Sequence, residues 1–176
     1  MAQKRFPILK PALEPLEVPA VSKTIYPPPH DKVVKGRSKR KLAPALGLKD
    51  FGVNLTTLMQ GAASAMRHHH SNNDEFVYIV DGEATLITDA GEQTLSTGMC
   101  AGFPKGKKDG HHLVNKSDRP VLYLEVGTNN MPDLIHYPDA RLWLYEDEKG
   151  RGTFSNKAPK LGKAKAAPKA KAKKKR

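Results

Sequence analysis

One stretch of the chain is decisive for the fold: Arg67-His68-His69-His70-Ser71-Asn72-Asn73-Asp74-Glu75, followed at once by the apolar run 76–80. Successive side chains of a strand point to opposite faces, so His68 and His70 face one way and His69 faces the other. Residues 71–74 are turn formers, and an apolar run after such a turn is typical of the returning strand of a hairpin. The pattern predicts that Glu75 opens a strand beside two imidazoles that share one cavity.

This cluster has the composition of a divalent metal site. Imidazole nitrogens and carboxylate oxygens bind first-row transition ions, and three or four such ligands hold an ion while leaving positions open. A further imidazole must therefore come from elsewhere in the chain. His111 is the best candidate, because Gly and Pro residues before it suit a turn and residues 113–115 after it suit the start of a new strand.

Two spaced motifs resemble those of the cupin superfamily. The first comprises Gly61, His68-x-His70, Glu75 after four residues and Gly82 after six more; the second comprises Gly98, Pro104-x-Gly106 and His111-x-x-x-Asn115. The similarity extends from about residue 51 to about residue 139, where the chain resembles small single-domain bacterial cupins. The resemblance implies an all-β fold, the cupin jelly-roll β-barrel.

The resemblance also implies the metal ligands, one divalent transition ion per chain being held by His68, His70, Glu75 and His111. Two spacings depart from the family pattern: six residues rather than five separate Gly61 from His68, and four rather than two separate Gly106 from His111. The second departure leaves His112 as an alternative ligand. His111 is preferred because its spacing to Asn115 fits the motif. The ligand types suit several ions, and the family's redox members favour Fe²⁺ or Mn²⁺ ahead of Zn²⁺ or Ni²⁺.

Other polar residues are candidates for supporting the site. Asn115, Tyr123 and Glu125 are expected to orient the imidazoles. Tyr123 and Glu125 share one face of a predicted strand, which lines either the pocket or solvent; in the pocket, Glu125 would be a general base. These two are the candidate catalytic residues, the alternative for Glu125 being an exposed strand carboxylate. Alternation places Arg67 opposite His68, which argues against Arg67 as a clamp for an anionic substrate.

Short apolar runs separated by turn residues recur through the middle of the chain and predict strands. The runs are residues 53–59, 76–80, 84–88, 92–95, 102–103, 112–114 and 121–126, and the turns between them include 81–82, 89–91, 97–98 and 117–120. Many short strands at close spacing favour an antiparallel sandwich or barrel.

Charge divides the chain into segments. The net charge is +12, yet residues 51–156 hold nine Lys/Arg against fourteen Asp/Glu, so the ends are basic. We expect an extended, proline-rich N-terminal arm with a solvated basic run in residues 1–50, a cupin domain in 51–145, an extension in 146–157 and a disordered Lys/Ala-rich tail in 158–176. The tail either binds nucleic acid or another polyanion weakly, or only aids solubility.

Other features bear on compartment and assembly. A single cysteine, Cys100, excludes an intrachain disulfide and agrees with a reducing cytoplasm. No stretch is long and apolar enough to span a membrane, and the N-terminus has no apolar signal core, so a cytoplasmic protein without membrane contact is expected. The resemblance to small cupins implies a homodimer.

Three classes of function follow. The first is a metal-dependent enzyme acting on a small oxygenated organic molecule, of dioxygenase, decarboxylase, isomerase or lyase type. The second is a ligand-binding or sensor cupin whose basic tail contacts nucleic acid, although no helix-turn-helix pattern accompanies the barrel. The third is a storage protein with a vestigial site, against which the intact ligand spacing argues. The enzyme is favoured.

Overall fold

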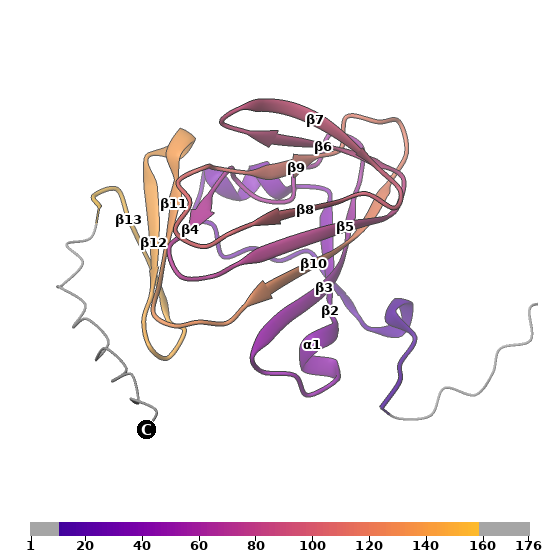
Figure 1. Ribbon diagram of the computed structural model, residues 1–176, viewed down its shortest axis with the longest axis horizontal. Helices are drawn as coiled ribbons and strands as arrows, with labels where there is room; N and C mark the ends of the chain where they lie inside the picture. The colour runs from indigo at the N-terminus through magenta and orange to yellow at the C-terminus, as the bar shows by residue number, and fades with distance from the viewer. Residues whose placement is uncertain (1–10, 159–176) are drawn as a thin grey trace, which may run out of the picture.

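Antiparallel strands are the main secondary structure of the chain in the computed structural model, which describes residues 11–158 (Figure 1). The largest sheet has the strand order β1-β2-β3-β10-β5-β8. Its strands are β1 (Ala20–Val21), β2 (Arg37–Lys41), β3 (Phe51–Leu58), β10 (Val121–Thr128), β5 (Glu75–Asp81) and β8 (Cys100–Phe103). On β5, Val77 and Ile79 are buried while Phe76, Tyr78 and Val80 are exposed, as the period of two requires.

A three-stranded sheet, in the order β7-β6-β9, faces the inner side of the large sheet. Its strands are β7 (Gly91–Ser96), β6 (Glu83–Thr88) and β9 (His112–Val114). The main core lies between the two sheets and consists of Leu58, Ala62, Val77, Ile79, Ala84, Leu86, Leu95, Leu113, Val121 and Tyr123. Burying these apolar side chains from both sheets is the main driving force for their association.

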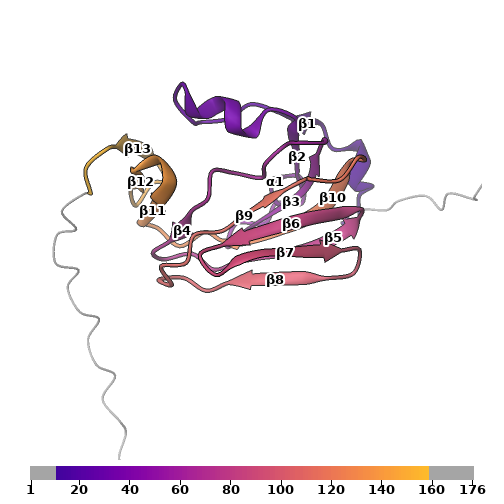
Figure 2. The same cartoon turned by 90° about the horizontal axis from the view of Figure 1, so that it is seen from above.

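A further sheet of four strands, in the order β13-β12-β11-β4, lies at one end of the molecule (Figures 1 and 2). It contains β13 (Gly152–Ser155), β12 (Leu142–Glu146), β11 (Asp133–Tyr137) and β4 (His69–His70). Strands β11 to β13 were not among the predicted strands. Residues of β11 and β12 form a second apolar cluster with Met66, which precedes β4; its other members are Ile135, Tyr137, Leu142 and Leu144.

The predicted hairpin between the histidines and the run 76–80 is wrong. Strand β4 pairs with β11, His70 opposite Ile135 and His69 opposite His136, and not with β5. The physical reason lies in residues 71–74, whose polar groups bond to Asp133 and Thr128 instead of closing a hairpin ladder. Glu75 still opens its strand, as expected.

The strands predicted from the middle of the chain are confirmed, each within a few residues of its predicted bounds. Hydrogen bonding among residues 11–158 does not run around a closed barrel; the sheets instead face one another as a jelly roll. One glycine is required at the turn between β5 and β6. Gly82 has a φ of +87°, and a Cβ there would lie 2.9 Å from the carbonyl oxygen of Pro120.

The N-terminal segment is largely extended up to β2, with 3₁₀ turns η1 (Pro15–Glu17) and η2 (His30–Val34). Tyr26 in this segment packs edge-on against Tyr137 of the four-stranded sheet, with ring centroids 5.6 Å apart. The expectation of a solvated basic run was wrong for residues 37–41, which form β2 with Arg37 buried, because alternate residues of a sheet strand face the interior.

The remaining helical elements are α1 (Leu42–Ala45), which contacts β3, and the 3₁₀ turn η3 (Pro138–Ala140). None of the helices in residues 11–158 combines the length and apolar character needed to cross a membrane. The predicted disordered tail lies outside the described residues, apart from residue 158.

Candidate metal centre

Three imidazoles converge on one carboxylate oxygen. The Nε2 atom of His111 lies 2.9 Å from Oε2 of Glu75, and the Nε2 atoms of His68 and His70 each lie 3.5 Å from the same oxygen. Donor atoms of His68, His70 and Glu75 all lie within 4.8 Å of one another. The structure therefore brings together the four residues that the sequence singled out.

Each of the three sheets supplies part of this cluster. His70 belongs to β4, Glu75 is the first residue of β5, and His111 directly precedes β9. The backbones of His68 and His111 form an isolated antiparallel bridge, with N–H···O distances of 3.1 and 2.9 Å. The ring of Phe103 stacks on that of His111, with centroids 3.5 Å apart. The imidazoles are thus held by backbone pairing and by packing.

Hydrogen bonds at the far ring nitrogen fix two of the imidazoles. Nδ1 of His68 donates to the carbonyl oxygen of Met66 at 2.8 Å, and Nδ1 of His70 donates to Oδ2 of Asp133 at 2.5 Å. Since both acceptors carry no proton, each ring holds its proton on Nδ1 and presents an Nε2 lone pair to Glu75. His69 points away and lies 3.2 Å from His136, as the alternation predicts.

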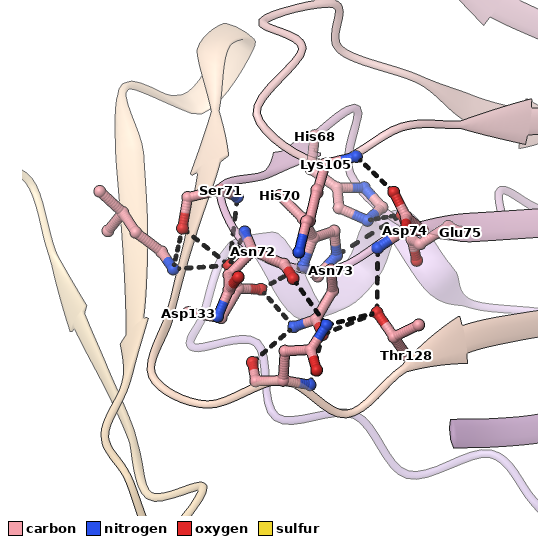
Figure 3. Close-up of polar contacts among 12 residues, drawn as sticks. His68, His70, Ser71, Asn72, Asn73, Asp74, Glu75, Lys105, Thr128 and Asp133 are labelled. Carbon is pink, nitrogen blue, oxygen red and sulfur yellow. Dashed lines mark hydrogen bonds and ion pairs between the residues drawn. The ribbon is translucent and has the colours of Figure 1, made fainter. Parts of the chain in front are cut away.

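Asp133 is the most heavily bonded carboxylate near the site, and Figure 3 shows how the loop 71–74 wraps around it. Its Oδ1 accepts from the backbone N–H groups of Ser71, Asn72 and Leu134 and from the Ser71 hydroxyl, at 2.8–3.1 Å. Its Oδ2 accepts from Asn73 at 2.9 Å and from His70. The side chain is fully buried, so this acceptor cannot turn away from His70.

The electrostatics of the cluster follow from these contacts. Burial would raise the pKa of Glu75, but the hydrogen bond from His111 and the nearby His68 and His70 hold that pKa well below its usual value. Burial would lower the pKa of His70, but the Asp133 carboxylate raises it. Burial lowers the pKa of His111. The carboxylate is therefore ionised and available as a ligand near neutral pH.

The cluster fits a first-row transition ion. Such an ion binds nitrogen and oxygen at about 2.0–2.2 Å, so two of its ligands at right-angle to tetrahedral spacing lie about 2.8–3.6 Å apart. The distances of 2.9 and 3.5 Å between the imidazoles and Glu75 fall at these values. Two Nε2 lone pairs facing a carboxylate oxygen also repel one another unless a cation or proton lies among them. The donor atoms therefore have the spacing that a metal ion requires, and a bound cation would relieve the repulsion between them.

The alternative ligand His112 and the predicted supporting residue Asn115 have other partners. His112 bonds through Nδ1 to the carbonyl oxygen of Ala65, so it is His111 that reaches Glu75. Asn115 bonds to the backbone of Leu58 and Arg119 and does not orient an imidazole, so that expectation was wrong. Its buried amide closes the turn before β10. The spacing of the motif does not reveal this structural role.

Arg67 lies outside the centre, in agreement with the alternation of the strand. Its guanidinium pairs with Asp139, with Nη2 2.6 Å from Oδ1, and with Asp89. These partners compensate its charge, so Arg67 is not a clamp for a substrate.

A cavity of about 260 Å³ adjoins the cluster and is lined by His68, Glu75 and His111. Tyr123 and Glu125 line the same cavity, so their shared face points inward rather than to solvent. Glu125 accepts from Lys39 Nζ at 2.5 Å, from Asn54 Nδ2 at 2.8 Å and from the Tyr123 hydroxyl at 3.1 Å. Neither Tyr123 nor Glu125 bonds to an imidazole within the described part of the chain, so the expectation that they orient the rings was wrong: their bonds run to each other and to β2 and β3.

Burial raises the pKa of Tyr123 well above its usual value, and the adjacent Glu125 carboxylate raises it further. The phenol therefore stays protonated and donates to Glu125. With Lys39 and Asn54 also donating, the Glu125 carboxylate is fixed in one orientation in the cavity wall.

Comparison with known proteins agrees with this arrangement. The family model for the cupin domain matches residues 54–127. A sugar phosphate isomerase from a cupin superfamily of Silicibacter pomeroyi is 36% identical, with a TM-score of 0.79, over 82% of this chain and 92% of its own. The chain belongs to the cupin superfamily. Its residues 54–127 contain both halves of the metal cluster.

A more distant likeness supports the fold alone. The polyketide cyclase RemF of Streptomyces resistomycificus is 19% identical, with a TM-score of 0.57, over 69% of this chain and 82% of its own. Among curated proteins, no sequence matches this cupin significantly. Cupins often bind a metal, and the cluster of His68, His70 and Glu75 is a candidate site of that kind.

Sequence reasoning missed several residues of the site. Asp133 is followed by Leu134-Ile135-His136-Tyr137, a short run with β-branched and aromatic residues that is typical of a strand. Arg37 and Lys39 line the cavity from β2, and their spacing of two residues on a strand places them on one face. The signal was present, but the basic character of residues 36–41 suggested solvent exposure.

Proposed function

We propose that this cupin is a divalent-metal-dependent isomerase that acts on a small sugar phosphate. The observation that carries the proposal is the convergence of three Nε2 atoms on Glu75 in a cavity that holds a second fixed carboxylate, Glu125. The similarity to the Silicibacter protein supports an isomerase among the reaction types that the metal ligands allow.

The size of the cavity supports a small substrate. Its volume of about 260 Å³ lies below the range of about 300–1,000 Å³ that is common for drug-sized ligands. The many oxygen atoms of a small sugar phosphate can form hydrogen bonds with the polar side chains that line this cavity, among them Lys39 and Asn54. The ion would be held by His68, His70, Glu75 and His111, with Fe²⁺ or Mn²⁺ proposed ahead of Zn²⁺ or Ni²⁺.

Isomerisation between an aldose and a ketose requires only proton transfers. A base removes the proton from the carbon that bears a hydroxyl beside the carbonyl and returns it to the neighbouring carbon, while another proton moves between the two oxygens. No oxidant or reductant is consumed. A divalent ion, when bound, polarises the carbonyl and makes the adjacent C–H more acidic.

We assign the base to Glu125. Its carboxylate lines the cavity, and Lys39, Asn54 and Tyr123 fix its position, which keeps its geometry ready for the C–H proton. The Tyr123 hydroxyl keeps its proton and positions this carboxylate through a hydrogen bond of 3.1 Å. His68, His70 and His111 are occupied with the ion in this scheme, and Glu75 is a ligand rather than the base.

The test is solvent isotope exchange. Full-length metal-loaded protein is incubated in D₂O with triose, tetrose, pentose and hexose phosphates, and proton NMR follows ketose formation and deuterium entry beside the carbonyl. For the productive substrate, Glu125→Gln should keep its metal and lose about 100-fold or more in kcat. Glu92→Gln, the same change on the exposed strand β7, is the matched control and should leave kcat unchanged.

The outcome also decides between the enzyme and the sensor. Absence of exchange with every sugar phosphate of the series contradicts the isomerase. Tight binding of one of them without turnover would support the ligand-binding cupin instead. Turnover that survives in Glu125→Gln would remove Glu125 from the mechanism while leaving the reaction in place.

A further inference from the structure

Arg37 is a buried cation in the wall of the metal cavity. It begins strand β2 and its exposed fraction is only 8%. Its Nη1 donates to the carbonyl oxygen of Ser64 at 2.6 Å, but its Nε is buried without any hydrogen-bond partner. The guanidinium lines the same cavity as His68 and Glu75. A buried donor without a partner therefore belongs to a residue that lines a space that a ligand can enter.

No carboxylate of residues 11–158 forms an ion pair with Arg37, and the segments 1–10 and 159–176 contain no Asp or Glu. The other basic side chain of the cavity, Lys39, is neutralised by Glu125 at 2.5 Å. The two residues thus differ in the charge of their partners: Lys39 pairs with the Glu125 carboxylate, whereas Arg37 donates to the neutral carbonyl group of Ser64.

An arrangement of this kind is costly unless a ligand completes it. Arginine stays protonated in proteins, so Arg37 cannot escape the cost of burial by losing its charge. A buried charge without a counter-charge, and a buried N–H without an acceptor, both destabilise the fold. A planar guanidinium matches the oxygens of phosphate or carboxylate, which would satisfy both groups at once.

We propose that Arg37 binds the anionic group of the substrate, a phosphate or a carboxylate, and so sets the specificity of the cavity for anions. The anion would bind at the β2 wall while the rest of the molecule faces His68, Glu75 and His111. The inference rests on the proposed function only for the expectation that the anion is a phosphate. Binding of an anion at Arg37 does not require turnover.

The test measures binding of inorganic phosphate to the full-length, metal-loaded protein by calorimetry at fixed ionic strength. Arg37→Gln removes the charge, and the loss of a charge-assisted contact should weaken phosphate binding by about tenfold or more. Arg40→Gln is the matched control, because Arg40 lies on the same strand, donates to the Val18 carbonyl and does not line the cavity. It should bind phosphate as the wild type does. The basic tail is present in all three proteins.

A parallel titration with acetate separates the two anion classes. Loss of either phosphate or acetate binding in Arg37→Gln alone supports the proposal. Equal binding of both anions by Arg37→Gln and Arg40→Gln overturns it, since the anions would then bind to the ion or to the tail. If Arg37→Gln fails to fold by circular dichroism, crystals of the wild type grown with phosphate decide: density against the guanidinium supports the proposal, and phosphate found only elsewhere overturns it.

The two proposals can fail separately. If Arg37→Gln loses phosphate binding and the wild type isomerises no sugar phosphate, the anion site stands and the isomerase fails. If the wild type isomerises a sugar phosphate and Arg37→Gln matches Arg40→Gln in both phosphate binding and KM, the isomerase stands and the anion site fails.

Discussion

Replacing Asp133 with asparagine should switch the proton of His70 to the wrong nitrogen. Three backbone N–H groups and one hydroxyl point at Oδ1, so the amide oxygen of the new side chain must take that position. The amide NH₂ then faces His70 and Asn73, which donate to Oδ2 in the native protein. Because two donors cannot bond to each other, His70 must move its proton to Nε2 and loses the lone pair that faces Glu75.

The size of the effect follows from the bonds that are lost. The hydrogen bond from Asn73 to a charged oxygen disappears, at about 1.5–3 kcal/mol, and the contact with His70 becomes a weaker neutral hydrogen bond, so the metal-free variant should lose about 2 kcal/mol or more of unfolding free energy. Loss of the group that orients a metal-binding imidazole should weaken metal affinity by about 10- to 100-fold. The variant should therefore fold less stably and bind metal poorly, rather than fail to fold.

The assay is competition for Zn²⁺ or Mn²⁺ against a chelating dye, with protein purified without a metal-affinity step. Urea unfolding of the metal-free proteins gives the stability difference. Asp118→Asn is the matched control, because Asp118 is exposed and makes no ion pair within residues 11–158. Wild-type metal affinity in a folded Asp133→Asn variant would refute the argument that Asp133 fixes the proton on Nδ1 of His70.

Three further predictions concern the fold, the assembly and the tail. Gly82→Ala should cost about 2 kcal/mol or more by urea unfolding, because it adds a clash with Pro120 to the strain of a positive φ; Gly98→Ala, with a φ of +89° but open space, should cost less, and equal losses would contradict the clash. We propose a homodimer through the exposed apolar outer face of β5, so Tyr78→Glu should yield a monomer in analytical ultracentrifugation while Thr94→Glu on β7 should not; an unchanged mass would exclude this face. Deleting residues 158–176 should abolish salt-sensitive retention on immobilised DNA and leave metal content unchanged, whereas retention after deletion would point to the N-terminal arm.

Local sequence signals were sufficient for the central strands and for the four clustered side chains. Alternation identifies which residues of the run 76–80 are buried, since each strand obeys the same period regardless of its partner. The histidines and Glu75 could be grouped because the spacing of the two motifs resembles that of the cupins. His111 could be preferred over His112 from its distance to Asn115, and the structure places His111 at Glu75.

Contacts that depend on strand pairing could not be read in this way. The hairpin was wrongly predicted because turn formers at 71–74 look alike whether they close a ladder or surround a carboxylate. Asp133 reaches His70 across 63 residues of sequence, and that contact exists only because β4 pairs with β11. Arg37 resembled a solvated residue until β2 paired with β3 and directed its side chain inward. Register between distant segments is set by the packed fold, which leaves little local trace.

The ligands of the cluster lie on or beside strands of three different sheets, with His70 on β4, Glu75 on β5 and His111 directly before β9. A bound ion would cross-link the three sheets, because separating any one of them from the others would require breaking a metal–ligand bond. Metal-loaded protein should then open as one cooperative unit, whereas depleted protein should open first at the end sheet. Loading with metal and resistance to proteolysis should rise and fall together, so a cell's proteases would remove the copies of this cupin that lack their ion.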